Sequence, residues 1–273
     1  MKLHYKKRFG GIGRLTGLAG LELLQHAHVC VVGVGGVGSW AVEALARSGV
    51  GELTLVDMDD VCISNVNRQL HALDGELGKP KVEVMARRVK AINPDCVVHA
   101  LQHFFLKSNA SQILSTGFDA VFDAIDSPSR KALLVAECRG RNIPVVIAGG
   151  AGGRRDPTQI EVADLAFSSH DRLLQQVRRH LRKEYGFARG DQAFGVDCVF
   201  SREQPAFPTR EGGVCTDRAA SSDLRLDCNT GFGTASFVTG SFGLAGVARI
   251  VQLITQKGSR KPRAEPAKPP EEK

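Results

Sequence analysis

The stretch His28-Val-Cys-Val-Val-Gly33-Val-Gly35-Gly36-Val-Gly38 decides how this sequence folds. Its apolar start, 28–32, is typical of a buried parallel strand. The four glycines fit the pattern G-x-G-x-x-G, and residues 39–48 continue with helical spacing until Gly49. Such glycines let the backbone approach a phosphate group, and the amino end of the following helix supplies N–H donors and a positive dipole. The stretch therefore predicts a strand, a phosphate-binding loop and a helix.

Strands and helices alternate along the chain on both sides of this unit. We expect the other parallel strands at residues 52–57, 96–101, 120–126 and 144–148. We expect helices at residues 15–25, behind a basic amino-terminal arm, and at 80–92 and 129–142. This alternation predicts an α/β fold with a doubly wound, Rossmann-like parallel sheet.

The second half of the chain has a looser pattern, which predicts a mixed C-terminal extension. After residue 158 we expect a strand (159–162), a basic helix (about 168–185), a turn-rich segment (186–230) and a closing helix (about 234–256). One domain over residues 1–256 would hold a nucleotide-binding half (about 1–155) and a substrate-facing half (about 156–256). The tail, 257–273, is rich in Pro, Lys and Glu, which predicts disorder.

The composition is that of a globular protein with a small basic surplus. Of the 273 residues, 42% are hydrophobic and 24% are charged, which excludes wholesale disorder. The formal net charge of +7 permits a polyanionic partner without requiring one. The seven cysteines form no C-x-x-C pair, which disfavours a structural zinc site. Their odd number and the absence of a signal peptide predict a reducing, cytoplasmic setting.

One uncharged stretch, 228–248, is about as long as a membrane span. Glycines interleave with Ser and Thr along it, and only ten of its residues are clearly apolar. We therefore expect a buried, Gly-rich helix or strand–helix unit here rather than a membrane segment.

Polar side chains that suit a nucleotide follow the second expected strand. Asp57 ends that strand, where a carboxylate can accept hydrogen bonds from ribose hydroxyls. Past it come Asp59, Asn65, Arg68 and, at a helix start, Lys81. Arg68 and Lys81 would be superfluous around a nicotinamide, but they suit a triphosphate, because charge builds up on its leaving pyrophosphate.

Asp126 is expected at the carboxyl end of the fourth strand, where open α/β sheets bind ligands. A carboxylate there can hold Mg²⁺ on phosphate oxygens. Structural ion pairs of Arg68 and Asp126 are the alternative interpretation. The binding interpretation is favoured because the glycine loop and the charged groups occur together, in chain order.

The motifs G-x-G-G-x-G, D-x-D, N-x-x-R-Q and G-x-x-K resemble those of the adenylating enzymes of the ubiquitin-activating superfamily, which includes the bacterial ThiF and MoeB proteins. The resemblance covers about residues 8–150. It implies that Asp57 binds ribose, that Mg²⁺ is served by Asp126, and that phosphates are handled by Asn65, Arg68 and Lys81.

The same resemblance implies a homodimer. In that superfamily an arginine near the amino terminus reaches into the site of the partner subunit. Arg14 is the best match in this sequence, and Arg8 is the second.

Further motifs in the second half resemble the family of tRNA threonylcarbamoyladenosine dehydratases, also called the TcdA or CsdL family. They lie at residues 149–153, 156–160, 195–201 and 227–233, and the similarity spans about residues 5–255. ThiF and MoeB relatives usually carry two C-x-x-C pairs for zinc, which this sequence lacks.

This family resemblance implies a substrate and two cofactors. The family acts on tRNA, rather than DNA, whose adenosine beside the anticodon carries a threonylcarbamoyl group, and it closes that group into a ring with loss of water. ATP and Mg²⁺ are implied, because a carboxylate must become an acyl-adenylate before a neighbouring group can displace its oxygen. Relatives connect to a cysteine desulfurase and sulfur-acceptor system. A thioester or persulfide on Cys228 is therefore one interpretation, and a buried or incidental cysteine is the other; Cys198 shares this ambiguity.

Two alternative functions stay open on the sequence. One is adenylation of the C-terminus of a ubiquitin-like sulfur-carrier protein, against which the missing zinc cysteines weigh. The other is an NAD-dependent oxidoreductase, which shares only the glycine loop.

The expected helix at 168–185 is a candidate RNA-binding surface. Leu173, Leu174, Val177 and Leu181 fall on one stripe at helical spacing. We expect the basic residues to point elsewhere, toward an RNA backbone, and the candidates are Arg178, Arg179, Arg182 and Lys183. A solvated helix face is the alternative.

Overall fold

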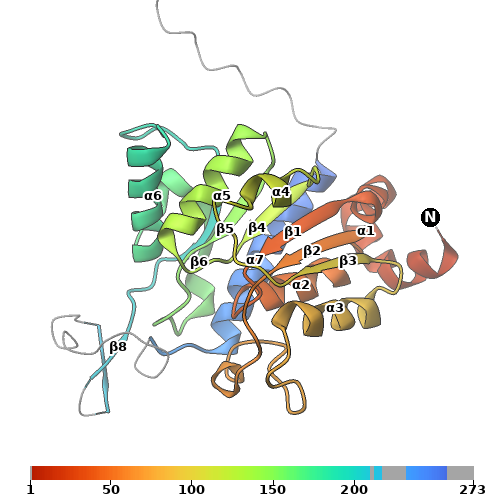
Figure 1. Ribbon diagram of the computed structural model, residues 1–273, viewed down its shortest axis with the longest axis horizontal. Helices are drawn as coiled ribbons and strands as arrows, with labels where there is room; N and C mark the ends of the chain where they lie inside the picture. Colours follow the sequence, from red (N-terminus) through yellow and green to blue (C-terminus); the bar gives the residue numbers. More distant parts are fainter. Residues whose placement is uncertain (1, 210–211, 217–231, 257–273) are drawn as a thin grey trace, which may run out of the picture.

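The computed structural model describes residues 2–209, 212–216 and 232–256. Within these residues, a seven-stranded sheet has the order β3-β2-β1-β4-β5-β7-β6, and β6 runs antiparallel to β7 while the other neighbours pair in parallel (Figure 1). The strands are β1 (His28–Val32), β2 (Glu52–Val56), β3 (Val97–Leu101), β4 (Ala120–Asp123), β5 (Val145–Ala148), β6 (Ile160–Asp164) and β7 (Asp197–Ser201). The expected α/β fold with a mainly parallel sheet is confirmed.

Helices cover both faces of this sheet, as a doubly wound fold requires. One face carries α1 (Leu3–His26), α2 (Gly38–Arg47), α3 (Lys81–Ile92) and α7 (Ser236–Thr255). The other face carries α4 (Ala110–Leu114), α5 (Pro128–Gly140) and α6 (Arg172–Glu184). Val29 and Val31 of β1 pack toward the first layer, and Cys30 and Val32 pack toward the second. All five residues of β1 are buried, which explains its unbroken apolar run.

The amino-terminal segment differs from the expected basic arm before a helix at 15–25. α1 begins at Leu3 and is interrupted at Gly17, whose φ of 79° departs from helical geometry. Tyr5 and Phe9 are buried, and the Tyr5 hydroxyl donates a hydrogen bond to the carbonyl of Gly49. Two aromatic side chains one turn apart therefore dock this segment as a helix, although most of its neighbouring residues are basic.

The segment 186–230, expected to consist of turns, contains a central strand. β7 lies between β5 and β6, and its last four residues are buried. Asp197 at its start forms an ion pair with Arg249 of α7, at 2.9 Å. A five-residue strand among glycine, proline and polar residues carries too little periodicity to stand out in the sequence. β8 (Phe207–Pro208) and β9 (Val214–Cys215) form a separate two-stranded sheet, and residues 210–211 and 217–230 lie outside the described part.

α7 is the buried, Gly-rich helix expected near the end of the chain. It is long and apolar enough to cross a membrane, with a mean hydropathy of 1.5, but 56% of its most apolar window is buried inside the protein. A Cβ on Gly243 would lie 2.6 Å from the carbonyl oxygen of Val37, and one on Gly246 would lie 2.2 Å from the ring of Phe122. This close packing against α2 and β4 is that of a core helix. Residues 228–231 and the tail 257–273, expected to be disordered, lie outside the described residues.

Candidate nucleotide site

A cavity of about 470 Å³ opens at the carboxyl ends of β1, β2, β4 and β5. It is lined by the loops that follow these strands, by the start of α3 and, from α7, by Thr239. The residues expected at a nucleotide site line it with one exception, Gly38: they are Gly33, Gly35, Gly36, Asp57, Asp59, Asn65, Arg68, Lys81 and Asp126. Segments far apart in the sequence thus converge on one edge of the sheet.

The glycine loop closes tightly beneath this cavity. Gly33 has a φ of 87°, and a Cβ on it would lie 2.8 Å from the carbonyl oxygen of Ala124. A Cβ on Gly38 would lie 1.8 Å from the carbonyl oxygen of Gly33, so Gly38 is packed under the loop instead of facing the cavity. Gly35 and Gly36 line the cavity directly before α2 begins. The amino end of α2 therefore faces a space in which an anion would be favoured.

Asp57 is fixed to the glycine loop by its carboxylate. One oxygen accepts a hydrogen bond from the Val34 amide at 2.6 Å, and the other accepts one from the Asp59 amide at 2.9 Å. Burial is the largest influence on Asp57 and raises the pKa of its carboxyl group above the ordinary value, against those hydrogen bonds and the positive charge of Lys81. The Lys81 side chain is buried, and its Nζ lies 2.8 Å from Oδ2 of the exposed Asp59. These contacts order the carboxylates and the lysine around the cavity without a ligand.

Asn65 and Arg68 lie on the loop that follows β2. The amide oxygen of the buried Asn65 accepts a hydrogen bond from the Cys62 backbone at 3.0 Å, which closes the turn. Nη1 of Arg68 donates to the Ser64 carbonyl at 2.5 Å and to Asn67 Oδ1 at 3.0 Å. Among the described residues Arg68 has no carboxylate partner. The structural ion pair considered as its alternative role is therefore not observed there.

Asp126 lies three residues past the end of β4, since the strand ends at Asp123 rather than at 126 as expected. Its side chain is exposed and lines the cavity. Within the described residues its carboxylate has no hydrogen bond or ion pair, in contrast to Asp57 and Asp59. Carboxylate oxygens of this kind are hard ligands that suit Mg²⁺, which usually takes one or two of them together with substrate phosphates.

The structure adds cavity residues that sequence reasoning missed. Arg130 at the start of α5 lines the cavity, and its guanidinium group lies 4.6 Å from the ring centre of Phe104, another lining residue. Beneath them, Lys131 Nζ lies 2.9 Å from Asp123 Oδ1, and both side chains are fully buried. The other carboxylate oxygen of Asp123 has no hydrogen bond to any described residue. The sequence signal for Asp123 was a charged residue at the end of an apolar strand. Sequence reasoning placed the strand end at Asp126 and therefore considered Asp126 alone.

Two further predicted sites do not join the cavity. Arg14 is exposed on α1, whose Tyr5 and Arg8 contact the backbone of Gly49 and Ile92, before β2 and β3 begin. That is the edge of the sheet opposite to the nucleotide cavity, so Arg14 could reach such a cavity only in a second copy of the chain. Cys228 lies outside the described residues.

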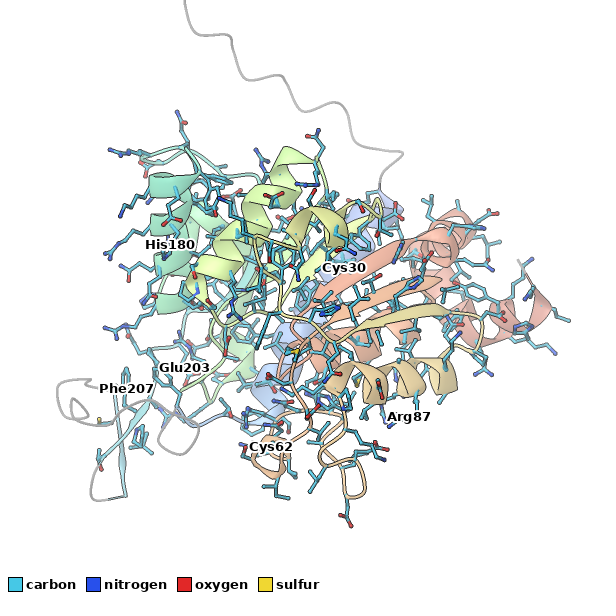
Figure 2. All side chains as sticks on the ribbon, in the orientation of Figure 1. Cys30, Cys62, Arg87, His180, Glu203 and Phe207 are labelled. Atoms are coloured by element: carbon cyan, nitrogen blue, oxygen red, sulfur yellow. The ribbon has the colours of Figure 1, made fainter. Side chains whose placement is uncertain are left out.

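The described cysteines offer one exposed thiol near the site. Cys198, expected in a loop, is buried within β7, and burial raises the pKa of its thiol to about 12. That placement disfavours a nucleophilic role. Cys62 is exposed at the loop after β2, where hydrogen bonds from Ser64 lower the pKa of its thiol (Figure 2).

The basic helix α6 divides the four candidate RNA-binding residues into two pairs. It forms an outer edge of the molecule, where His180 is labelled in Figure 2. Arg178 and Arg182 do not point away as expected. Arg178 Nη1 donates to the Ser168 carbonyl at 2.9 Å, and Arg182 donates to the Ala188 carbonyl at 3.1 Å and lies over the ring of Phe194. Arg179 and Lys183 are exposed.

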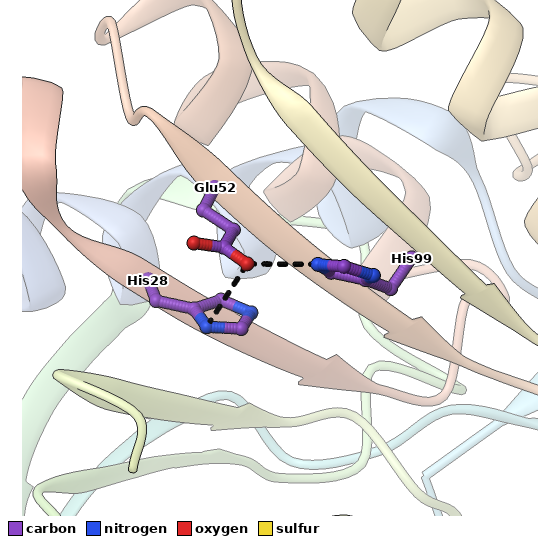
Figure 3. Close-up of side chains that lie close together, drawn as sticks. All are labelled: His28, Glu52 and His99. Carbon is purple, nitrogen blue, oxygen red and sulfur yellow. Dashed lines mark hydrogen bonds and ion pairs between the residues drawn. The ribbon is translucent and has the colours of Figure 1, made fainter. Parts of the chain in front are cut away.

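A second polar cluster lies at the opposite edge of the sheet (Figure 3). Oε1 of Glu52 lies 2.8 Å from Nε2 of His99 and 3.5 Å from Nδ1 of His28. The three ligand atoms lie within 4.8 Å of one another, and two imidazoles with one carboxylate form a set that zinc accepts. Glu52 already pairs with both histidines, and His28 also bonds Thr54 at 2.8 Å. The cluster is therefore satisfied by its own side chains.

The fold and the cavity define a class: nucleotide-binding α/β proteins with a glycine loop, a carboxylate on the next strand and cations facing one cleft. The chain belongs to the ThiF family, whose profile matches residues 11–269.

Within that family, the chain is similar over nearly its whole length to proteins of one kind. The tRNA threonylcarbamoyladenosine dehydratase of Escherichia coli (strain K12) is 48% identical over 258 residues, which are 94% of this chain and 96% of that protein. A solved structure named TcdA (CsdL) superposes with a TM-score of 0.88 at 46% identity, over 95% of this chain and 98% of that chain. The E. coli enzyme in complex with ATP gives a TM-score of 0.85 at 44% identity, over 95% and 98% of the two chains.

Proposed function

We propose that this protein is an ATP-dependent tRNA threonylcarbamoyladenosine dehydratase, which closes the threonylcarbamoyl group on the adenosine beside the anticodon into its cyclic form. The observation that carries the proposal is the 48% identity to an enzyme of that name across 94% of the chain. The cavity at the carboxyl edge supports it, because it gathers a phosphate loop, a ribose carboxylate and three cationic side chains in one place.

The chemistry requires activation of a carboxylate. The carboxylate of the threonyl group attacks the α-phosphate of ATP, the bond to the β-phosphate breaks, and pyrophosphate leaves with its electron pair. The resulting acyl-adenylate is then attacked by the carbamoyl group, which closes the ring, loses a proton and expels AMP. Both steps gain from holding the reacting groups together within one site.

The geometry suggests a role for each lining group. Asp57, already fixed to the glycine loop, would accept hydrogen bonds from the ribose. The amino end of α2, Arg68, Lys81 and Arg130 would stabilise the charge that builds up on the phosphates during the first step. Asn65 holds the turn that presents Arg68. None of these roles requires a proton transfer from a buried group.

Asp126 is the side chain that fits Mg²⁺ best, because its carboxylate faces the cavity without a partner in the described residues. A bound Mg²⁺ would neutralise charge on the phosphate oxygens during the transfer. Asp57 and Asp59 are already engaged with backbone amides and with Lys81.

A homodimer would give Arg14 a function. From the far edge of its own sheet, Arg14 could contact the phosphates only in the partner subunit. Arg14→Ala and Arg68→Ala should each inactivate the enzyme, and a mixture should recover part of the activity, because one site of each heterodimer keeps both arginines. Lack of recovery after confirmed subunit exchange would contradict a role across the interface.

Two further expectations accompany the substrate. A tRNA substrate implies a cytoplasmic enzyme, and the resemblance implies a cysteine desulfurase and sulfur-acceptor system as a partner, with Cys228 as the acceptor candidate. The sulfur-transfer role is separable from the dehydratase reaction, because ring closure consumes only ATP.

The decisive experiment measures the reaction directly. Purified protein, ATP, Mg²⁺ and tRNA carrying threonylcarbamoyladenosine should yield a nucleoside lighter by one water, with AMP and pyrophosphate in equal amounts. Mass spectrometry must follow gentle digestion, because the cyclic product should hydrolyse. Pyrophosphate exchange stimulated by a ubiquitin-like carrier protein, and not by this tRNA, would instead support the sulfur-carrier alternative.

A further inference from the structure

A second cavity, of about 400 Å³, adjoins the nucleotide cavity. Gly150, Gly152 and Leu173 line both. The second cavity lies between the glycine loop that follows β5 and the first turns of α6. Its other lining residues are Arg154, His170, Asp171, Arg172, Gln175, Gln176, Arg179, Pro205 and Phe232.

This cavity depends on glycines that let α6 and Phe232 approach the loop. A Cβ on Gly149 would lie 2.1 Å from Oδ2 of Asp171, and a Cβ on Gly152 would lie 2.8 Å from Cβ of Phe232. Asp171 caps α6 by accepting a hydrogen bond from the Leu174 amide at 2.9 Å, and it accepts a second from the Gly150 amide at 2.8 Å. The wall between the two cavities is therefore the 150–152 loop, whose one side chain is the methyl group of Ala151, together with Leu173. A buried carboxylate holds this loop in place through the Gly150 amide.

The charge of the lining is strongly positive. The lining contains three arginines, Arg154, Arg172 and Arg179, and one carboxylate, Asp171. The oxygens of Asp171 accept hydrogen bonds from two backbone amides. Arg154 is only 5% exposed. It donates through Nη2 to the carbonyl of His170, while its Nε and Nη1 have no hydrogen-bond partner among the described residues. A buried guanidinium group with unused donors is costly unless an anion or another acceptor completes it.

The remaining lining suits a nucleoside. Phe232 offers a ring, whose centre lies 5.2 Å from that of the tilted Phe207 ring, and bases stack readily on aromatic side chains. Gln175 and Gln176 on α6 offer amide groups that can hydrogen-bond base edges. An arginine cluster beside an aromatic ring and two amides is the chemistry of a nucleotide site.

We propose that this second cavity is the acceptor subsite, which binds the modified nucleotide of the RNA substrate with an oxyanion against Arg154, Arg172 and Arg179. The base lies near Phe232, and the threonylcarbamoyl group crosses the Gly150–Gly152 wall toward the ATP site. This inference rests on the proposed function and deepens it, because it assigns the place of the second substrate. The oxyanion is either the 5′-phosphate of the nucleotide or the threonyl carboxylate, and the two sources respond differently to the test below.

The test uses two small ligands and four forms of the full-length protein: wild type, a double variant, a control variant and Arg154→Lys. Threonylcarbamoyladenosine and its 5′-monophosphate are titrated calorimetrically into protein saturated with a non-hydrolysable ATP analogue. The variant Arg172→Gln/Arg179→Gln changes the exposed arginines of the cavity and leaves the buried Arg154 in place. Arg189→Gln removes a positive charge from an exposed position beyond α6, outside the lining, and is the control.

If the arginines bind the 5′-phosphate, wild-type protein and Arg189→Gln should bind the monophosphate at least about tenfold more tightly than the nucleoside. A charge-assisted hydrogen bond contributes at least that much to the affinity. The double variant should lose this difference. If the arginines instead bind the carboxylate, the double variant should lose affinity for both ligands by a similar factor. Arg154→Lys keeps the positive charge but loses the forked arrangement of donors. In either case it should lower the affinity for the ligand that contacts the arginines, but by less than the double variant does.

The proposal is overturned if the double variant binds both ligands as wild-type protein does, or if wild-type protein binds neither. Affinity for the ATP analogue, measured first, separates a damaged fold from a damaged acceptor subsite. Conversion of modified tRNA by wild-type protein is assayed in parallel. If tRNA is converted while the variants bind the small ligands normally, the proposed function stands and the subsite assignment fails; if no tRNA is converted, the proposed function itself fails.

Discussion

The two adjoining cavities at the carboxyl edge of the sheet are built in different ways. In the nucleotide cavity, most candidate site residues lie within a few residues of a strand end or a helix start, as Asp57 and Lys81 do. In the cavity beside α6, the charged groups come from a loop and a helix that meet only in the folded protein, as Arg154 and Arg179 do. Motifs in the sequence therefore describe the first cavity, and tertiary packing decides which arginines are available in the second.

The largest change in stability is expected at the buried ion pair between Lys131 and Asp123. Lys131→Met would leave the Asp123 carboxylate uncompensated in the interior, which should lower the free energy of unfolding by about 3–5 kcal/mol. Urea denaturation measures this change. The double variant Asp123→Leu/Lys131→Met should recover much of it, because no buried charge is left. Lys2→Met, which removes an exposed partner of Asp95, should leave the midpoint almost unchanged.

A stable Lys131→Met variant would contradict this role and would show that Asp123 is protonated in the folded protein. Burial does raise the pKa of the Asp123 carboxyl, and the positive charge of Lys131 lowers it. The pair also influences the cavity beside α6, because the positive charge of Lys131 acts to lower the pKa of Asp171.

The next largest effect concerns catalysis in the nucleotide cavity. Asp126→Asn should leave the fold intact and lower turnover by about a hundredfold or more, as for other groups that stabilise developing charge. The reason is loss of the carboxylate that fits Mg²⁺. ATP–pyrophosphate exchange measures the step, and Asp74→Asn, an exposed carboxylate outside the cavity lining, is the matched control. Exchange at the wild-type rate in Asp126→Asn would remove Asp126 from this role.

The fold of the first half could be predicted from the sequence because each element has a local signal. The β1–α2 unit is an example: an apolar run, a glycine loop and helical spacing follow one another without interruption. β7 could not be predicted, since it is recognised as a strand only by its neighbours β5 and β6. The α1 start was missed because docking of Tyr5 and Phe9 depends on the distant Gly49.

In the candidate site, too, residues with a local sequence signal could be predicted, and residues placed by tertiary packing could not. The residues from Gly33 to Asp126 were found because loops after parallel strands meet at one edge of the sheet. Arg130 and Arg154 were missed because nothing in their local sequence distinguishes them from surface arginines. Arg178 was misplaced because helical spacing gives the face of a residue but not the reach of a long side chain, which here turns back to Ser168.

A smaller effect concerns pH and His71, which follows the loop of Arg68. His71 is buried, and neither of its ring nitrogens has a hydrogen bond within the part of the chain that the structure describes. Burial lowers its pKa to about 4 from an unfolded value of about 6.5. Below pH 6.5 the unfolded chain binds the proton and the folded one does not, so stability is full above that pH. It should fall by about 1 kcal/mol per pH unit toward pH 4.

Urea denaturation across this pH range checks the slope. His71→Leu should flatten it, because leucine does not titrate and leaves no unpaired polar atoms in the interior. A residual slope is expected from His28, whose pKa burial also lowers. An unchanged slope in His71→Leu would show that His71 is protonated in the folded protein or gains water partners.

The smallest effect separates the two pairs of basic residues on α6. Replacing the exposed Arg179 and Lys183 with Gln should reduce the salt dependence of tRNA binding by up to about 2 units of slope, because each phosphate contact contributes roughly one. Replacing Arg178 and Arg182 with Gln should leave that slope nearly unchanged and lower the thermal midpoint instead. Their guanidinium groups hold the Ser168 and Ala188 carbonyls, and burial lowers the pKa of Arg178. Filter binding at several salt concentrations, paired with thermal denaturation, measures both. Equal loss of slope in the two variants would mean that Arg178 and Arg182 release their carbonyls to bind RNA, and packing would then no longer explain which arginines of this helix are available.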